Sequence, residues 1–427
     1  MNFKLQIILN LVYLRFVRKL YKFDFKKLQA IRWAKMQNTL LKSKFYQDYA
    51  NRNQDLKAYP VINKSIFMEN FDRINTLGIK SDEAYSIAIR AETSRDFEPM
   101  INGVTIGLSS GTSGNRGLFL ATEAERAIWV ACVLDRVIGF SLRKRSVAFF
   151  LRANSNLYNS VKSKILRFEF FDLLESLDDQ IPKLNDLKPT ILVAQPSMLI
   201  ELAKKKESGE LLINPDKIIS VAEVLYPEDA LYLKKIFNQT IHQVYQCTEG
   251  LLATTCEYGT LHFNEDFLVI EKQFIDSDCK RFHPIITDLM RTTQPIVRYE
   301  LNDIIHEKND CPCGAIGIEK IEGRSDDILV FNSLDDSQIK IFPDFFRKAI
   351  IMASKSINDY TLVQSSMNEL RLFIDSDKVT YELAKSSILN LLKERGVFNV
   401  AIYKSETRHH EKGNKLIRIR NDNRKAN

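Results

Sequence analysis

One stretch of the sequence, GLSSGTSGNRG from Gly107 to Gly117, has the composition of a phosphate-binding loop. It holds four glycines, three serines and a threonine between an apolar run and a predicted helix. Small residues let the backbone approach an anion, while N–H groups and hydroxyls donate hydrogen bonds to phosphate oxygens. No Gly-Lys-Ser/Thr triplet ends the stretch, so it is not a Walker loop. An ordinary surface loop can have the same composition, and the stretch alone does not distinguish the two.

Two carboxylates follow predicted strands further along the chain. The segment VYQCTEG ends one strand with Thr248 and Glu249. A carboxylate in that position can hold Mg²⁺ beside a triphosphate, because Mg²⁺ prefers one or two carboxylates together with phosphates. The segment PIVRYELNDI presents Asp303 after another strand, where it can accept hydrogen bonds from two sugar hydroxyls. We therefore predict a magnesium ligand at Glu249 and a ribose ligand at Asp303.

Two cationic residues complete the series. Arg324 lies in EGRSDDIL, where a guanidinium can bind ribose or phosphate. Lys415 follows Gly413 in HEKGNKLIRI, near the end of the chain. Each of these segments alone could be a solvated turn. Their order and spacing after the glycine-rich stretch predict a nucleotide site assembled from distant parts of the chain.

Four of the residues that commonly bind metals have a different pattern. Cys256 is followed six positions later by His262, and Cys311 and Cys313 stand in the sequence CPCG. Three thiolates and an imidazole complete a tetrahedral Zn²⁺ shell and leave no open position, which is typical of a structural site. The Cys-x-Cys spacing is tighter than the usual Cys-x₂-Cys, so four reduced, unligated side chains are the alternative.

Taken together, these motifs resemble the superfamily of adenylate-forming enzymes, which includes acyl- and aryl-coenzyme A ligases. The resemblance is strongest to the phenylacetate–coenzyme A ligase branch and to coenzyme F synthetase-like proteins associated with capsule biosynthesis. SSGTSG matches the phosphate loop of the superfamily, YQCTEG its Tyr-x-x-Thr-Glu motif, and RYELND the segment that ends in the ribose-binding aspartate. GRSDDIL matches the hinge motif, and GNKLIR stands in the place of the C-terminal catalytic lysine.

The resemblance implies a role for each matching residue. Thr248 and Glu249 would serve the α-phosphate and Mg²⁺, and Lys415 would be the catalytic lysine. Tyr245 would stack near adenine, and Glu223 stands at a strand end where relatives contact nucleotide or substrate. Asp303 and Arg324 would hold the ribose. Pyrophosphate would lie in a cradle formed by Ser109, Ser110, Gly111, Thr112, Ser113 and Gly114.

The implied reaction has two steps, the attack of a carboxylate on the α-phosphorus of ATP and the displacement of AMP by a nucleophile such as the thiol of coenzyme A. Its main physical demand is the neutralisation of charge, because an anion approaches a polyanion. The sequence departs from the superfamily at two places. Arg116 and Gly117 replace a Pro-Lys after the loop, and Glu300, Leu301 and Asn302 replace Thr-Gly in the ribose motif. These departures leave the identity of the acceptor open.

The hydrophobic pattern predicts how these residues are positioned. Short apolar runs alternate with helical stretches, which indicates a layered α/β domain with buried sheets over residues 1–326 and helices over residues 1–50. After a boundary near Asp326, a βαββαβ-like order predicts a small, mobile α+β domain over residues 327–427, with a mobile tail from Arg408. Strand candidates cover residues 146–153, 190–195, 217–225 and 242–247, and helix candidates cover residues 123–137 and 197–206.

Composition narrows the class of protein. The chain has 427 residues, 45% of them hydrophobic, and a net charge of +7. Residues 1–50 hold eleven Lys/Arg against two Asp, and residues 404–427 hold eight against three Asp/Glu. The positive charge therefore gathers at the two ends instead of on the folded body, which argues against a nucleic-acid partner. The first helices are expected to pack on the body, with contact between their basic face and anionic lipid as the alternative. No stretch is long enough for a transmembrane span, and we expect a cytoplasmic protein.

The sequence therefore favours an ATP-dependent ligase that activates an acyl or aryl carboxylic acid as acyl-AMP and passes it to an acceptor such as coenzyme A. Two alternatives remain open at this point. One is a nucleotidyltransferase that adenylates a hydroxyl, as the coenzyme F synthetase resemblance suggests. The other is a non-catalytic scaffold in polysaccharide biosynthesis, which is expected to lose the loop, the carboxylate or the terminal lysine, whereas all three are present.

Overall fold

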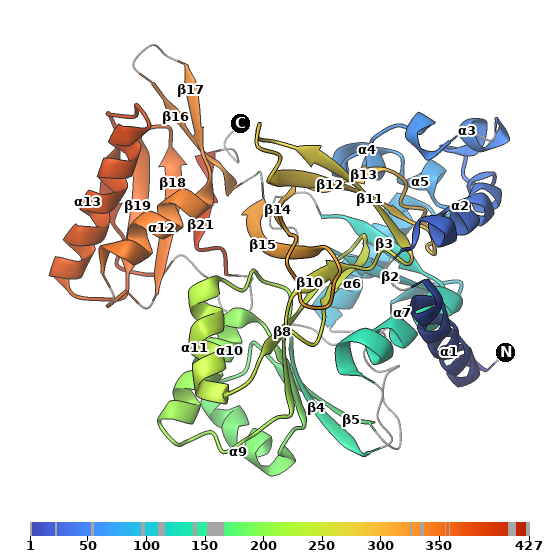
Figure 1. The fold of residues 1–427 in the computed structure, drawn as a ribbon, viewed down its shortest axis with the longest axis horizontal. Coiled ribbons are helices and arrows are strands. Elements are labelled where there is room, and N and C mark those ends of the chain that lie inside the picture. Colours follow the sequence, from blue (N-terminus) through green and yellow to red (C-terminus); the bar gives the residue numbers. More distant parts are fainter. Residues whose placement is uncertain are drawn as a thin grey trace. The chain divides into compact units, whose positions relative to one another are not determined.

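The computed structural model describes residues 2–21, 24–52, 55–94, 99–109, 116–139, 143–151, 166–324, 327–333, 337–354, 356–357, 359–408 and 416–423. The chain divides into two compact units (Figure 1). The first consists of Met1–Leu301 and His306–Lys320, and the second of Asn302–Ile305 and Ile321–Asn427. The layered α/β class predicted from the sequence is confirmed.

A parallel set of strands forms one half of the main sheet. These strands are β4 (Arg145–Leu151), β5 (Leu166–Asp172), β6 (Ile191–Ala194), β7 (Lys217–Ser220) and β8 (Ile241–Cys247), in the order β8-β7-β6-β4-β5. All four residues of β6 are buried, as expected for a parallel strand with both faces covered. The helices between these strands, α9 (Leu177–Leu187), α10 (Pro196–Glu207) and α11 (Pro227–Phe237), contribute to the same hydrophobic core.

The other half of the main sheet is largely antiparallel, and apart from a strand before Asp303 the sequence did not predict its strands. From β8 the order continues through β9, β10, β15, β14 and β12 to β11, and β13 pairs with β12. The bounds are β9 (Gly250–Thr255), β10 (Leu261–Phe263), β11 (Leu268–Phe274), β12 (Arg281–Asp288), β13 (Tyr299–Glu300), β14 (Asp303–Lys308) and β15 (Gly317–Arg324).

The first 140 residues are mostly helical, as predicted for residues 1–50. A small sheet of β1 (Met100–Ile101), β2 (Val104–Leu108) and β3 (Leu118–Ala121) follows these helices, and β2 and β3 flank the glycine-rich stretch. The helix α7 (Glu123–Cys132) continues as the π-helical turn η2 (Val133–Ile138). The preceding helices are α1 (Phe3–Tyr21), α2 (Lys26–Leu40), α3 (Gln47–Asn51), the 3₁₀ turn η1 (Leu56–Ala58), α4 (Lys64–Glu69), α5 (Phe71–Ile74) and α6 (Ser81–Ser94).

The second unit has its own hydrophobic core. A hairpin of β16 (Leu329–Asn332) and β17 (Gln338–Ile341) precedes a four-stranded sheet in the order β20-β19-β18-β21. The strands and helices expected here all form. Their bounds are α12 (Pro343–Ala353), β18 (Tyr360–Ser366), β19 (Glu369–Ile374), α13 (Lys378–Glu394), β20 (Ala401–Lys404) and β21 (Ile419–Asn421).

One expectation about the second unit is wrong. The tail from Arg408 was expected to be mobile throughout, yet its residues Ile419–Asn421 form β21, which pairs in parallel with β18. Arg418 is only 4% exposed, and the side chain of Asn421 donates to the carbonyl of Ile328 at 2.9 Å. This strand could not be predicted from its polar sequence, because its partner strand β18 lies more than fifty residues away along the chain.

A buried ion pair holds the turn η2 to the main sheet. Nη2 of Arg136 lies 2.6 Å from Oδ2 of Asp266, and both side chains are 2% exposed. The guanidinium also stacks over the ring of Phe267, 4.9 Å from its centroid. Two charges that are almost fully removed from water stabilise the fold only while both are present, because a single buried charge has no solvation.

We predict that Arg136→Met lowers the free energy of unfolding by about 3–5 kcal/mol, because Asp266 then remains buried without a partner. Urea denaturation measures the loss. Lys204→Met is the matched control, since Lys204 pairs with Glu201 at 3.0 Å while both side chains are about half exposed. The control should change the free energy by less than about 0.5 kcal/mol. Equal effects of the two variants would contradict the prediction.

Candidate active site

The parallel strands bring distant segments of the chain to one edge of the sheet. Parallel strands have their carboxyl ends on the same side, and ligands of open α/β sheets bind outside these ends. The strand β7 ends at Ser220, just before Glu223, and β8 ends at Cys247, just before Thr248 and Glu249. This edge therefore carries three of the residues that the sequence singled out.

Thr248 and Glu249 form the tight turn between β8 and β9. The Thr248 hydroxyl donates a hydrogen bond to Oε2 of Glu249 at 2.9 Å. Gly250 follows with a φ of 153°, and a Cβ at this position would come within 3.3 Å of Oδ2 of Asp288. A side chain there would be strained and would press on a buried carboxylate, so glycine keeps the turn closed.

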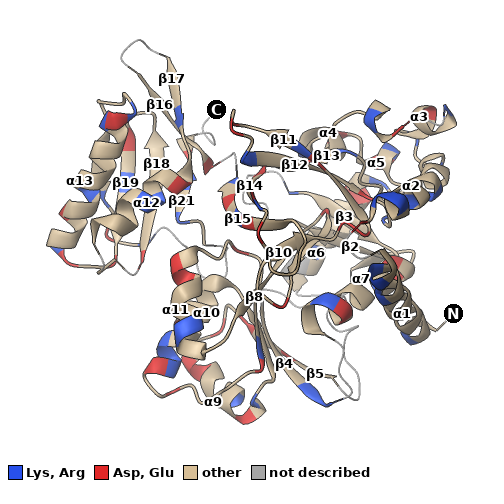
Figure 2. Cartoon of the chain, in the orientation of Figure 1, with Lys and Arg blue, Asp and Glu red and all other residues tan. Residues whose placement is uncertain are grey.

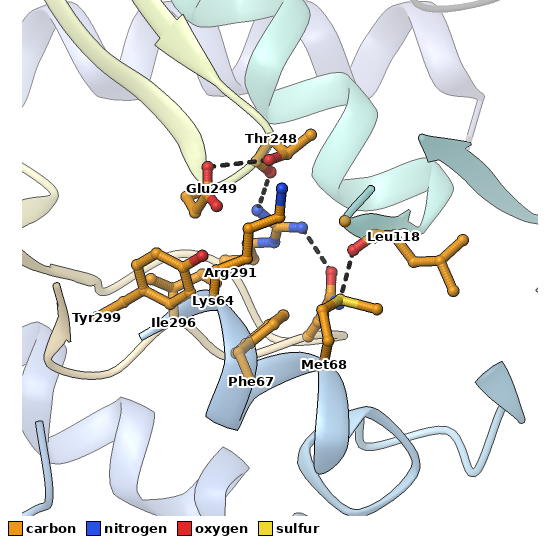
Figure 3. A pocket seen from close by; sticks show the side chains of 11 residues that line it. Lys64, Phe67, Met68, Leu118, Thr248, Glu249, Arg291, Ile296 and Tyr299 are labelled. Atoms are coloured by element: carbon orange, nitrogen blue, oxygen red, sulfur yellow. Dashed lines mark hydrogen bonds between the residues drawn. The ribbon is translucent and has the colours of Figure 1, made fainter. Parts of the chain in front are cut away.

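The turn opens into a pocket that lies within the first unit (Figure 3). One wall is α4 and a second wall follows β12. The lining combines two cations, one carboxylate and an apolar side. The lining residues are Lys64, Phe67, Met68, Gly117, Leu118, Thr248, Glu249, Arg291, Gln294, Ile296 and Tyr299.

Arg291 connects the parts of this pocket, and the sequence reading missed it. Its Nη1 donates to the carbonyl of Thr248 at 2.7 Å, and its Nη2 donates to Oε1 of Gln294 at 2.7 Å (Figure 3). Gln294 is fully buried, accepts from the N–H of Leu120 at 3.1 Å and donates to the carbonyl of Leu118 at 3.2 Å. The signal was the polar run RTTQ directly after an apolar strand and before the ribose motif.

Glu125 anchors the same segment from the other side. It is the third residue of α7 and closes a capping box with Thr122. Its Oε1 also accepts from the N–H groups of Thr292 and Thr293 at 2.7 and 2.8 Å. Burial raises the pKa of Glu125, but the hydrogen bonds from Thr293 and Thr122 and the charge of Arg291 outweigh it and lower the pKa overall. The carboxylate therefore stays ionised and holds the segment that carries Arg291.

Burial raises the pKa of two further groups near the pocket, Tyr299 and Asp288. Burial raises the pKa of Tyr299 well above its ordinary value, and the charge of Glu249 and a hydrogen bond with it act in the same direction. The phenol therefore stays protonated and can donate to the Glu249 carboxylate. Burial also raises the pKa of Asp288 to about 6, although the N–H of Met290 and the charge of Arg291 oppose the shift.

The stem of the predicted phosphate loop is closed by hydrogen bonds. The N–H of Gly117 donates to the Ser109 hydroxyl at 2.7 Å, and the N–H of Ser109 donates to the carbonyl of Gly117 at 2.8 Å. A Cβ on Gly117 would meet Cε of Lys64 at 3.4 Å, so the stem lies beside a pocket cation. The rest of the predicted cradle lies outside the described residues, namely Ser110, Gly111, Thr112, Ser113 and Gly114.

Two predicted nucleotide contacts do not line this pocket. Glu223 accepts from the N–H and the hydroxyl of Ser197 at 3.2 and 3.1 Å, and so binds the first turn of α10. The residue before it, Ala222, has a φ of 69°, which is strained for a residue other than glycine. Tyr245 is 9% exposed and pairs with Ala253 of β9.

Asp303 and Arg324 are brought together within the second unit. Asp303 begins β14 and Arg324 ends β15, and Nε of Arg324 lies 3.6 Å from Oδ1 of Asp303. The side chain of Asp303 is 15% exposed and that of Arg324 is 35% exposed. Lys415 and the expected hinge residue Asp326 lie outside the described residues.

The four predicted zinc ligands lie together in the first unit. Their ligand atoms all lie within 4.8 Å of one another. Sγ of Cys311 is 3.7 Å from Sγ of Cys256 and 3.2 Å from Sγ of Cys313, and Sγ of Cys313 is 3.3 Å from Nε2 of His262. A tetrahedral zinc shell with Zn–S bonds of about 2.3 Å requires sulfur atoms about 3.8 Å apart and sulfur and nitrogen about 3.5 Å apart. The donor set and the Cys256–Cys311 distance fit a zinc ion, and the sulfur atoms of Cys311 and Cys313 lie about 0.6 Å closer together than such a shell requires.

The surroundings of the cluster agree with this fit. Nδ1 of His262 lies 2.8 Å from the carbonyl of Ile316 and must donate to it, which leaves the lone pair of Nε2 facing Cys313. Burial opposes ionisation of the Cys311 thiol, but hydrogen bonds, first among them that from the Cys313 N–H, lower its pKa to about 6. Burial and the neighbouring Cys311 raise the pKa of Cys313 to about 11. Two ionised thiols at this distance repel each other, and a cation at the centre of the cluster would remove that repulsion.

Comparison with known proteins was made at the level of families, curated relatives and solved structures. A scan against protein families finds none that matches the chain. One curated relative, protein CapK of Staphylococcus aureus, is 27% identical over 184 residues, which are 40% of this chain and 39% of CapK. The match thus spans about two fifths of that relative.

Several solved structures are similar over much more of the chain. 2-Hydroxyisobutyryl-CoA ligase in the postadenylation state has a TM-score of 0.60 at 16% identity and covers 97% of this chain and 89% of its own. The anthranilate CoA ligase AuaEII, in complex with anthranoyl-AMP, has a TM-score of 0.51 at 12% identity, and the match covers 73% of this chain and 66% of AuaEII. ATP-bound MatB from Rhodopseudomonas palustris has a TM-score of 0.52 at 12% identity, and the match covers 73% of this chain and 66% of MatB. The chain has the fold of the adenylate-forming enzymes, so the predicted resemblance is confirmed at the level of the fold.

Proposed function

We propose that this protein is an ATP-dependent ligase that activates a carboxylic acid as an acyl-adenylate and then transfers the acyl group to a thiol such as that of coenzyme A. The observation that carries the proposal is the turn of Thr248 and Glu249, which opens into a pocket containing Arg291 and Lys64. The fold supports it, because the similar structures hold acyl-adenylates, ATP or CoA.

The charges of the pocket suit the first step. The carboxylate oxygen of the acid attacks the α-phosphorus of ATP, the bond to the bridging oxygen breaks, and pyrophosphate leaves with that oxygen and its electron pair. Lys64 and Arg291 place two positive charges at the wall where the loop stem begins. Fixed cations stabilise the negative charge that develops on the phosphate oxygens, because they need no reorganisation during the reaction.

Glu249 is the proposed magnesium ligand, and a bound Mg²⁺ would supply positive charge that offsets the negative charge of the phosphates. The Tyr299 hydroxyl donates a hydrogen bond to the same carboxylate and so helps to orient it. The Thr248 hydroxyl, now hydrogen-bonded to Glu249, is the group that can turn toward the α-phosphate. In the second step a thiolate attacks the acyl carbon, the bond to the adenylate oxygen breaks, and AMP leaves.

The experiment that tests the function is carboxylate-dependent exchange of radioactive pyrophosphate into ATP, measured over a panel of aliphatic and aromatic acids. At least one acid should support exchange, and Glu249→Gln should lower its rate by about 10²–10³, because one charge-stabilising group is lost from the transition state. Excess Mg²⁺ should not restore the rate.

Glu201→Gln provides the matched control, since this carboxylate is 48% exposed on α10 and pairs only with surface lysine in the described structure. It should exchange pyrophosphate at the rate of the natural sequence. Full activity of Glu249→Gln, with wild-type dependence on Mg²⁺, would remove Glu249 from the site.

We further propose Lys415 as the lysine that neutralises the α-phosphate during adenylation. The ammonium of a long, flexible lysine side chain can approach for one step and withdraw for the next. Lys415→Ala should slow pyrophosphate exchange by about 10²-fold or more, while transfer from a chemically supplied acyl-adenylate continues. Lys412→Ala is the control, three residues earlier on the same segment. A loss of exchange in Lys412→Ala with normal exchange in Lys415→Ala would assign the role to Lys412.

The fit of Cys256, His262, Cys311 and Cys313 supports one structural zinc ion per chain. Four protein ligands leave no open position, so the ion would hold β9 and β10 to the CPCG turn. Metal analysis of protein purified without chelators should find about one zinc per chain. Cys311→Ser with Cys313→Ser should lose the zinc and lower the melting temperature. Protein in which the thiols of Cys256, Cys311 and Cys313 all react and which contains no zinc would contradict this proposal.

A further inference from the structure

The helix α1 is apolar on two opposite faces. Its inner face, with Ile7, Leu11, Leu14 and Val17, is buried, and α1 packs along α7 within the first unit (Figure 1). Covering one apolar face is enough for an amphipathic surface helix, whose other face is normally polar. The second apolar face of α1 therefore requires a separate explanation.

The outward face forms a continuous apolar stripe, which we call the outer α1 stripe. Its seven side chains are between 45% and 64% exposed. Their spacing of three and four residues keeps them on one side of the helix, over a length of about 22 Å. The stripe consists of Leu5, Ile8, Leu9, Val12, Tyr13, Phe16 and Leu20.

Ion pairs fix the direction in which the stripe points. Nε of Arg15 lies 2.7 Å from Oδ1 of Asp135, and Nη1 of Arg18 lies 2.9 Å from Oδ2 of the same carboxylate. The Asp135 side chain is only 5% exposed and belongs to the turn η2. Two arginines on one nearly buried carboxylate resist rotation of the helix, so the stripe stays turned outward.

The charged residues of α1 and of the neighbouring α2 are all basic. Neither α1 nor α2 contains an acidic residue, and Lys4, Lys19, Lys26 and Lys27 are exposed. Figure 2 shows basic residues on both helices. Residues 1–50 carry a net charge of +9, whereas the rest of the chain sums to −2. The apolar stripe and the concentrated positive charge thus occupy the same end of the chain.

We infer that the outer α1 stripe is a docking surface for an anionic lipid membrane. A helix with exposed Leu, Phe and Tyr and with lysines at its border lies in the plane of the interface, with its side chains among the acyl chains and its ammonium groups on anionic headgroups. Across the described residues no helix is long and apolar enough to cross a membrane. A second copy of this chain fits less well, because it would bring the same positive charge to the stripe.

The test uses the full chain and two vesicle preparations, one of phosphatidylcholine and one of phosphatidylcholine and phosphatidylglycerol in equal parts. The protein should sediment with the anionic vesicles, and added salt should weaken the binding. Val12→Glu with Phe16→Glu should reduce binding at least about tenfold, because two central apolar side chains become charged. Lys4→Gln with Lys19→Gln should reduce it roughly fivefold for each charge removed.

Leu212→Glu with Leu231→Glu is the matched control, because these leucines are 68% and 70% exposed elsewhere on the first unit. This control should bind vesicles like the natural sequence, and circular dichroism should show that every variant keeps its fold. Absence of binding to both preparations would overturn the inference. It would equally be overturned by a dimer, measured by sedimentation velocity, that dissociates only in Val12→Glu with Phe16→Glu, since a second copy would then cover the stripe.

Discussion

The candidate site depends on the guanidinium of Arg291. One nitrogen holds the carbonyl of Thr248 and another holds Gln294, which in turn bonds to both Leu118 and Leu120 at the exit of the phosphate-loop stem. The turn after β8 and the strand after the loop thus share one planar, five-donor group. A lysine could not replace it, because an ammonium lacks the fixed fork that bonds two acceptors in one plane. The distance between the loop stem and Glu249 is set by this side chain.

Charge that is removed from water is paired at several places in the described part of the first unit. Glu125 receives N–H groups from Thr292 and Thr293, and Arg136 pairs with Asp266. These pairs position segments more than they add stability, because the cost of desolvation offsets much of the attraction. An enzyme that neutralises phosphate charge needs cations that cannot turn away to water. The hydrogen bonds of Arg291 provide one in the pocket, and the same principle fixes α1 through Asp135.

The two proposed roles of the first unit are spatially separate. The pocket is built from α4, the loop stem and the segments after β8 and β12, whereas the outer α1 stripe lies on a helix that contributes no residue to it. Docking on a membrane would therefore leave the lining of the pocket unchanged.

The sequence determined the chemistry-bearing motifs, because their residue types follow from local requirements. Glycines and hydroxyls suit an anion, Thr248 and Glu249 follow a strand, and the Cys/His set suits tetrahedral zinc. Because apolar runs between helices must be buried, local periodicity likewise predicted the helices of residues 1–50 and four of the five parallel strands, but not β5. Most of the antiparallel half of the main sheet escaped prediction because its short strands have little periodicity of their own.

Only the tertiary structure decided which of these motifs meet. It placed Glu249 beside Arg291, forty-two residues later in the chain, and Glu223 against Ser197 instead of in the pocket. It also turned β21 from an expected mobile tail into a paired strand, and left the outer α1 stripe uncovered. These outcomes depend on hydrogen bonds and burial between residues far apart in the sequence. Local propensity contains no information on such partners, because the free energy of each contact exists only once the sheet has brought both sides together.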